Sequence, residues 1–128
     1  MKLLLDTHLL LWAASGSGKL PAEARDLIVE PGAEPVASAA SLWEVAIKAG
    51  LGRADFRVDP HLLRRGLLDN GYAELPVSGA HAVEAGLLPP LHRDPFDRML
   101  IAQARVEGIL LLTADSMLAR YPGPIRAL

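Results

Sequence analysis

The chain has 128 residues, no cysteine and a formal net charge of −2 at pH 7. This length suits one domain, taken as residues 1–128, and the lack of cysteine excludes disulfides and thiolate metal sites. No apolar run is long enough to cross a membrane, and Asp6 interrupts the N-terminal one too early for a signal peptide. We therefore expect a cytoplasmic protein.

The first half of the chain alternates between strand and helix patterns. An apolar strand is predicted over residues 2–6, and a helix over 8–14 follows it directly. A helix over 21–30 and a short strand over 34–39 come next. The helix predicted over 41–52 is closed by glycines near its end. Each strand is thus followed by a helix, which is the pattern of crossover connections.

The second half continues this alternation. The helix over 59–71 has Asp59 as its predicted N-cap and proline at its first position. A strand over 72–77 and a glycine-weakened helix over 78–88 precede the clearest helix of the chain, at 94–108. The remaining elements are a buried strand, a short helix and a last strand, predicted over 109–115, 116–121 and 124–128.

This order predicts an α/β fold with a mostly parallel central sheet and helices on both faces. In such sheets ligands bind beyond the carboxyl ends of the strands. Two of the predicted strands end in an acid, Asp6 and Asp115, so both side chains are expected at the same edge. Each could instead be the N-cap of the helix that follows it.

Two further acids lie near predicted helix starts. Ser41 precedes Glu44 by three residues, and Asp94 precedes Asp97 by three. Both pairs have the spacing of a capping box, in which the two side chains satisfy free backbone N–H groups. Capping is therefore a sound structural interpretation of Glu44 and Asp97.

The direction of these side chains favours a site. Asp97 shares an apolar stripe of its helix with Ile101 and Ala104. Glu44 also lies on an apolar stripe, although Lys48 at the next turn offers a surface ion pair instead. An inward charge is costly unless something pairs with it, and clustered acids disfavour one another's ionised forms. A bound divalent cation would compensate, and carboxylate oxygens suit magnesium or manganese.

Four segments in this order resemble a known family: "LLLDTHLLLW", "ASAASLWEVAIKAGLG", "HRDPFDRMLIAQA" and "LLLTAD". The chain is similar to PIN-domain nucleases, and closely to the VapC-type toxins of bacterial toxin–antitoxin pairs. The resemblance covers essentially the whole chain. It implies a three-layer α/β/α fold and metal-dependent hydrolysis of RNA phosphodiester bonds.

The resemblance also implies the site residues. The catalytic and metal-binding acids of the family fall on Asp6, Glu44, Asp97 and Asp115, with Mg²⁺ or Mn²⁺ as the cofactor. A water activated there would attack phosphorus in line. Thr7 and Thr113 stand beside two of the acids and could hydrogen-bond the acids or the waters of the metal. Asp94 is interpreted as a helix cap.

The implied partners are RNA, a cognate antitoxin protein and a second copy of the chain, with no role for a membrane. The formal net charge of −2 argues mildly against a nucleic-acid binder, which is often basic. However, ten of the 13 basic residues are arginine, which suits phosphate. Arg93 and Arg98 are candidates for phosphate contacts because they flank the third acid.

Two other readings remain open at this point. A haloacid-dehalogenase-type phosphotransfer enzyme also has an Asp after its first strand, but it needs a second Asp two residues later, where this chain has His8. A non-catalytic PIN-like module that only binds proteins is the other alternative. Such modules usually lack some of the acids, and all four are present here.

Overall fold

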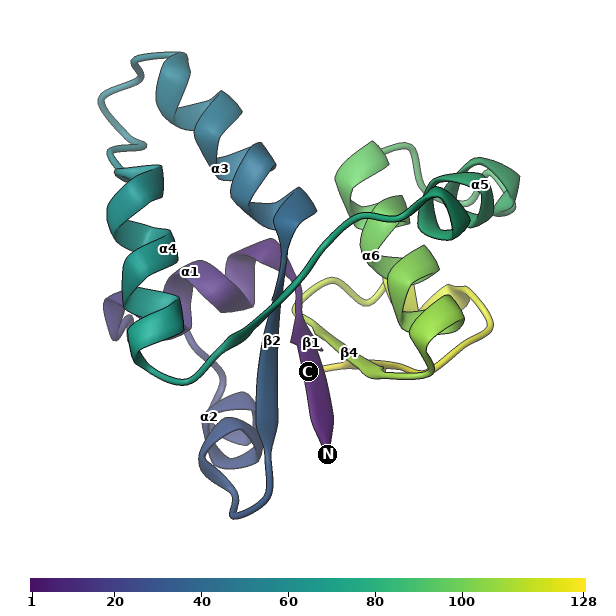
Figure 1. Ribbon diagram of the computed structural model, residues 1–128, viewed down its shortest axis with the longest axis horizontal. Helices are drawn as coiled ribbons and strands as arrows, with labels where there is room; N and C mark the ends of the chain where they lie inside the picture. The colour runs from purple at the N-terminus through teal and green to yellow at the C-terminus, as the bar shows by residue number, and fades with distance from the viewer.

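The computed structural model describes residues 1–128, and five parallel strands form its central sheet (Figure 1). Their order is β3-β2-β1-β4-β5, so the predicted mostly parallel sheet is confirmed and every pairing is parallel. The strands are β1 (Lys2–Leu5), β2 (Glu34–Ser38), β3 (Ala73–Leu75), β4 (Leu110–Thr113) and β5 (Ile125–Ala127).

Helices connect all the strands except the last pair, which a single 3-10 turn joins. None of the helices is both long and apolar enough to cross a membrane. The helices are α1 (Thr7–Ser15), α2 (Ala22–Val29), α3 (Ala39–Gly50), α4 (Pro60–Asp69), α5 (Gly79–Leu87) and α6 (Pro95–Glu107), and the 3-10 turn is η1 (Leu118–Arg120). The predicted elements are therefore confirmed in type and order, except that the helix expected before β5 is this 3-10 turn.

Two apolar clusters hold helices to the two faces of the sheet. Successive strand residues point to opposite faces, so Leu3 and Leu5 join one cluster whereas Leu4 joins the other. The first cluster packs α1, α2 and α4 against the sheet, and the second packs α6 against it. The chain thus forms three layers, with α5 packed on α6 (Figure 1).

The start of α3 differs from the sequence prediction. Ser38, at the end of β2, caps this helix by accepting a hydrogen bond from the Ala40 N–H at 3.0 Å. Ser41 lies inside the helix, so the predicted capping box of Ser41 and Glu44 is wrong. The strand runs into the helix without a loop, which places Glu44 in the second turn and leaves its carboxylate free for other contacts.

The order of the strands creates a switch point between β1 and β4. From β1 the chain moves outward through β2 and β3 on one side, and β4 and β5 are added on the other. The crevice beyond the carboxyl ends of two such strands is where open α/β sheets bind ligands. Asp6 directly follows β1, and Asp115 lies two residues beyond β4.

Candidate active site

Asp6 is buried at the end of β1, and both of its carboxylate oxygens accept hydrogen bonds. Oδ1 accepts from the Leu9 N–H at 2.8 Å and so caps α1. Oδ2 accepts from the Thr113 hydroxyl at 2.6 Å and from the Ala114 N–H at 2.9 Å. The side chain therefore fixes the start of α1 and joins β1 to the end of β4.

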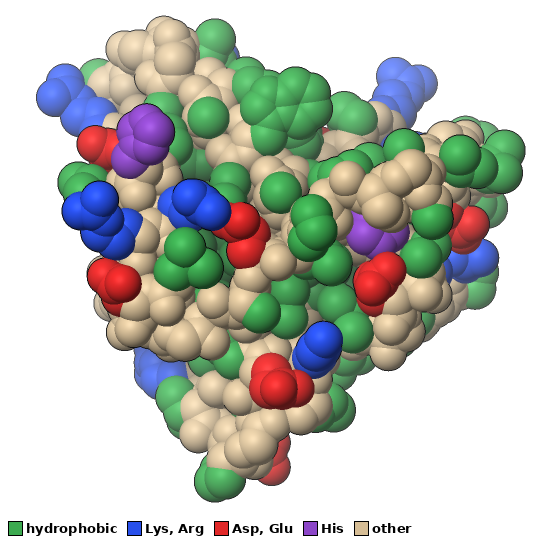
Figure 2. Space-filling model, in the orientation of Figure 1, with side chains coloured by type: hydrophobic (Ala, Val, Ile, Leu, Met, Phe, Trp, Pro, Cys, Tyr) green, Lys and Arg blue, Asp and Glu red, His purple; other side chains and the backbone are tan.

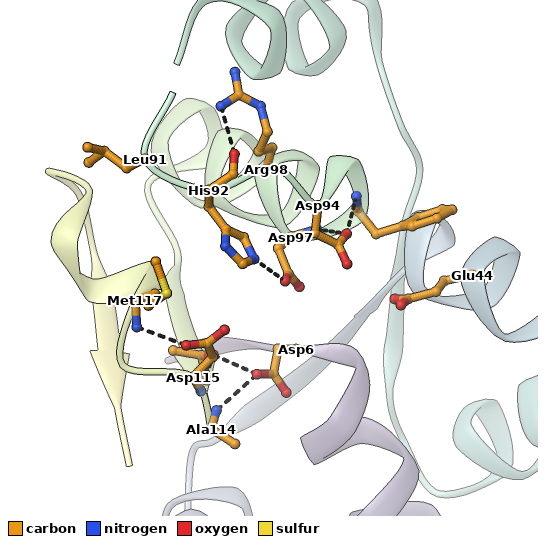
Figure 3. Close-up of polar contacts among 12 residues, drawn as sticks. Asp6, Glu44, Leu91, His92, Asp94, Asp97, Arg98, Ala114, Asp115 and Met117 are labelled. Atoms are coloured by element: carbon orange, nitrogen blue, oxygen red, sulfur yellow. Dashed lines mark hydrogen bonds and ion pairs between the residues drawn. The ribbon is translucent and has the colours of Figure 1, made fainter. Parts of the chain in front are cut away.

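Thr113 places Asp115 next to Asp6. Its hydroxyl, which is fully buried, donates to Asp6 and accepts from the Asp115 N–H at 3.0 Å. The Asp115 carboxylate accepts from the Met117 N–H at 2.9 Å, which closes a turn rather than capping a helix directly. Figure 3 shows Asp6 and Asp115 side by side, as the parallel strands require.

Asp97 approaches these two acids from the first turn of α6 (Figure 3). Asp94 caps this helix by accepting from the Phe96 and Asp97 N–H groups at 2.8 and 3.1 Å. The side chain of Asp97 does not complete a capping box; it accepts a hydrogen bond from His92 Nε2 at 2.7 Å. The cap therefore belongs to Asp94, and Asp97 is left for the cluster of acids.

The electrostatic surroundings of Asp97 oppose its ionisation. Burial raises the pKa of Asp97, whereas the hydrogen bond with His92 lowers it. The charges of Asp94 and, more weakly, Glu44 raise this pKa further. A carboxylate in such surroundings gains from any nearby positive charge, including that of a metal ion.

Glu44 faces the cluster from α3, on the far side of Asp97 (Figure 3). One oxygen, Oε2, lies 3.0 Å from the Lys48 ammonium group, so the alternative ion pair is also present. The other oxygen, Oε1, is buried and has no hydrogen-bond partner. A buried carboxylate oxygen without a partner is costly, so this atom calls for a cation or a water.

The structure gives the remaining predicted residues distinct places. The Thr7 hydroxyl donates to Ser41 Oγ at 2.9 Å, so it links α1 to α3 and contacts none of the acids. Arg93 is exposed in the loop before α6. The Arg98 guanidinium already donates to four backbone carbonyls, so a contact with phosphate stays a prediction that these bonds oppose.

His92 was missed as a site residue in the sequence. One nitrogen or oxygen from each of His92, Asp97 and Asp115 lies within 4.8 Å of the others. The available signal was the spacing of "HRDPFD", in which His92 stands five residues before Asp97 in a loop beside the site. A single histidine in a loop is most often a surface residue, and only the fold turns this ring toward the acids.

The donor set fits a hard divalent cation. Carboxylates of Asp97 and Asp115 lie close enough together to share an ion, with His92 beside them, whereas Asp6 and Glu44 lie outside this closest group. The unpartnered Oε1 of Glu44 faces the same cluster. Mg²⁺ and Mn²⁺ prefer oxygen ligands, and Mn²⁺ also accepts imidazole. The residues present therefore suit either ion.

A large hollow lies elsewhere, between α1 and α4. It has a volume of about 720 Å³ and contains none of the four acids. Its lining is mainly apolar, with Leu11, Trp12 and Leu63 among the side chains. Its charged lining residues are Lys19, Arg57 and Asp59, so it holds a single carboxylate. We place the chemistry at the acids because several carboxylates lie together there and one buried oxygen, Glu44 Oε1, has no partner.

Comparisons with known proteins bear on the family and the fold. The family model described as PIN domain matches residues 3–124. By sequence, no curated protein matches the chain.

Similar folds occur among solved structures. VapBC2 from Rickettsia felis, bound to a DNA fragment from its promoter, has a TM-score of 0.72 at 15% identity, covering 99% of this chain and 98% of that one. DNA-bound VapBC from Salmonella typhimurium has a TM-score of 0.70 at 17% identity, and again 99% of this chain and 98% of that one are covered. VapC20 from Mycobacterium tuberculosis, a sarcin-ricin loop cleaving toxin, has a TM-score of 0.60 at 16% identity, covering 92% of this chain and 93% of that one. At these identities the likeness establishes the fold.

Proposed function

Because the chain belongs to the PIN domain family, we propose that it is a divalent-metal-dependent ribonuclease and the toxin of a toxin–antitoxin pair in the cytoplasm. The observation that carries the proposal is the meeting of acids at the switch point of the sheet. Asp6 and Asp115 come from adjacent parallel strands, and Asp97 and Glu44 face them from two helices.

Four carboxylates would hold Mg²⁺ or Mn²⁺ in this site: Asp6, Glu44, Asp97 and Asp115. The bound ion would lower the pKa of a water molecule and offset the negative charge that develops on phosphorus during in-line attack. This reaction needs no serine, cysteine or histidine nucleophile. It therefore matches a site built from carboxylates.

The side chains of the protein supply the arrangement that this chemistry needs. Thr113 and the Ala114 N–H hold Asp6 in one orientation, so the carboxylate needs no reorganisation when substrate binds. Glu44 Oε1 and Asp115 are the two candidates for orienting the attacking water and taking its proton. Glu44 Oε1 has no protein partner to displace. Arg93, exposed in the loop next to Asp94, is placed for a contact with RNA phosphate.

An antitoxin and a second copy of the chain are the proposed protein partners. The Rickettsia and Salmonella structures are VapBC proteins bound to DNA, and a toxin–antitoxin complex from Klebsiella pneumoniae has the same fold. The apolar hollow between α1 and α4 would take an amphipathic segment of the antitoxin. A basic side chain of that segment would then reach the acids, whose negative potential is strong without metal.

A cleavage assay on RNA with a matched pair of variants tests the enzymatic part of the proposal. Asp97→Asn should abolish cleavage in Mn²⁺ or Mg²⁺. Asp94→Asn, three residues away on the same helix turn, removes the same charge but keeps the cap, because asparagine caps well. It should remain active. If wild type shows no metal-dependent cleavage, the proposed ribonuclease is refuted and a module that only binds proteins is favoured. Cleavage that is equal in wild type and Asp97→Asn would contradict the proposed catalytic site.

A further inference from the structure

The loop between α5 and α6 is held by a buried tyrosine from a distant part of the chain. Tyr121, which is 2% exposed, accepts hydrogen bonds at its hydroxyl from the Leu91 N–H at 3.2 Å and the His92 N–H at 2.9 Å. The same hydroxyl donates to the Pro89 carbonyl at 2.7 Å. One side chain thus fixes the backbone on both sides of the turn that leads to His92.

Arg98 holds the same loop from α6. Its guanidinium donates to the carbonyls of Ala85 and Leu88, at 2.8 and 3.0 Å, near the end of α5. It also donates to the carbonyls of Pro89 and His92, at 3.1 and 3.3 Å. The planar fork of arginine suits several fixed acceptors at once. The carbonyls at the end of α5 have no partners within their own helix.

These bonds bring the imidazole of His92 against Asp97, with Nε2 at 2.7 Å from Oδ2 (Figure 3). A metal ligand must be ionised, and an ionised carboxylate can only accept a hydrogen bond, so in the metal-binding form of Asp97 the proton lies on Nε2. A ring nitrogen that bears a proton has no lone pair for a metal. His92 Nε2 therefore acts as a donor to Asp97, although a ring nitrogen of His92 lies within 4.8 Å of oxygens of both Asp97 and Asp115.

We propose that His92 is a positioning residue that orients the Asp97 carboxylate for metal binding, and that Tyr121 and Arg98 hold His92 in place for this task. Oδ2 of Asp97 accepts from His92, which leaves Oδ1 without a hydrogen-bond partner in the protein. Such outer hydrogen bonds fix the orientation of a ligand before the ion arrives. The inference rests on the proposed function, because it takes Asp97 as a metal ligand.

The test measures metal binding and needs no cleavage. Metal-stripped protein is titrated calorimetrically with Mn²⁺ and separately with Mg²⁺. His92→Ala should weaken the binding of both ions by a similar factor, about 10- to 100-fold. His92→Gln restores an N–H donor near the position of Nε2 and should recover most of the affinity. Tyr121→Phe should weaken the binding of both ions less than His92→Ala does. His61→Ala, an exposed histidine on α4, is the matched control and should bind as wild type.

The other outcomes have definite meanings. If His92→Ala loses affinity for Mn²⁺ alone, the imidazole is a direct ligand and the positioning role is wrong, since nitrogen ligands favour the transition metal. Unchanged affinity for both ions in a folded His92→Ala protein would also overturn the positioning role. A failure of His92→Gln to recover metal binding would overturn it as well. Asp97→Asn is titrated alongside; if it binds metal as wild type does, the proposed metal site itself fails.

Discussion

At the scale of single residues, Asp6 shows that a structural and a functional interpretation can both hold. A carboxylate that ends a buried strand is either a helix cap or part of a polar site. Here Oδ1 caps α1, and Oδ2 meets Thr113 and Ala114 from the strand that completes the site. The folding of α1 and the geometry of the site therefore depend on one side chain.

Asp6→Asn is consequently expected to affect both stability and metal binding. Whichever way the amide is turned, its NH₂ group faces either the Leu9 or the Ala114 N–H, and that donor loses its acceptor. The metal-free variant should be destabilised by about 1–3 kcal/mol, unlike the near-neutral change expected at a simple cap. Thermal unfolding in the presence of a chelator measures this cost.

The same experiment repeated with Mn²⁺ separates the two roles of Asp6. At about 100 times the dissociation constant, the ion should stabilise wild type by about 2.7 kcal/mol. The variant should gain much less. An equal metal response in the two proteins would leave Asp6 as a cap only.

The raised pKa of Asp97 gives a prediction for pH in metal-free buffer. Its folded-state pKa lies above the unfolded value, so protonation favours the folded protein. This benefit is complete below the unfolded pKa and is lost as the pH rises through the folded pKa. Above the folded pKa wild type has lost it, so there Asp97→Asn, which can still accept from His92, should be the more stable protein.

This advantage of Asp97→Asn should shrink as the pH falls through the folded pKa, because the wild-type carboxyl then takes up its proton. Urea denaturation at several pH values, with a chelator present, measures the difference. An advantage that grows on acidification would mean that the surroundings favour the ionised form of Asp97.

At the scale of elements, a buried polar network joins α3 to α6, a contact that the sequence did not predict. Ser38, at the junction of β2 and α3, donates to Gln103 Oε1 on α6 at 2.6 Å. The Gln103 amide nitrogen lies 3.4 Å from both the Pro76 carbonyl and the His81 ring. Gln103 is fully buried and thus joins the start of α3, which carries Glu44, to α6, which carries Asp97.

Gln103→Met keeps the volume of this side chain but removes its polar atoms. It should destabilise the protein by about 1–3 kcal/mol, because the Ser38 hydroxyl and the Pro76 carbonyl lose buried partners. Ser38→Ala alone also removes a helix cap, so the double variant provides the control. If the bond is real, the double variant should lose less stability than the two single variants added together; strict additivity in denaturant unfolding would argue against the bond.

The elements were largely predictable, whereas the contacts between them were not. Apolar runs, Pro60 and Pro95 at helix starts, and acids at strand ends are local signals that identified strands and helices in the right order. The start of α3 was misplaced because Ser38 and Ser41 both precede apolar helical residues, and only the end of β2 decides between them. His92 and Gln103 were overlooked because their partners depend on how distant segments pack, which no local pattern contains.

At the scale of the whole molecule, exposed apolar side chains lie over α3 and α5 (Figure 2). On α3 and just beyond it, Trp43 is 65%, Ile47 43% and Leu51 58% exposed. Val83 and Leu87 of α5 are also exposed. Several exposed apolar side chains gathered on one helix, as on α3, are typical of an interface, which supports the proposed pairing of two chains.

Trp43→Glu is expected to convert the proposed homodimer into a monomer, because it places a charge among the exposed apolar side chains of α3. Sedimentation at micromolar concentration should show wild type as a dimer and the variant as a folded monomer. Leu62→Glu, at an exposed apolar position on α4, is the control and should remain a dimer. Wild type that sediments as a monomer would contradict the prediction.

The hydrogen bond between Thr113 and Asp6 joins residues that lie 107 positions apart in the chain. A ribosome therefore completes β1 long before it makes the strand that must lie beside it, and the acids of the site are added at intervals until Asp115. A nascent chain that is still short of this residue has no means of assembling the proposed catalytic centre. If the protein is the ribonuclease proposed here, the RNA of a cell that makes it is exposed to cleavage only after translation has passed β4. Interrupted products that end before β4 would not cleave RNA.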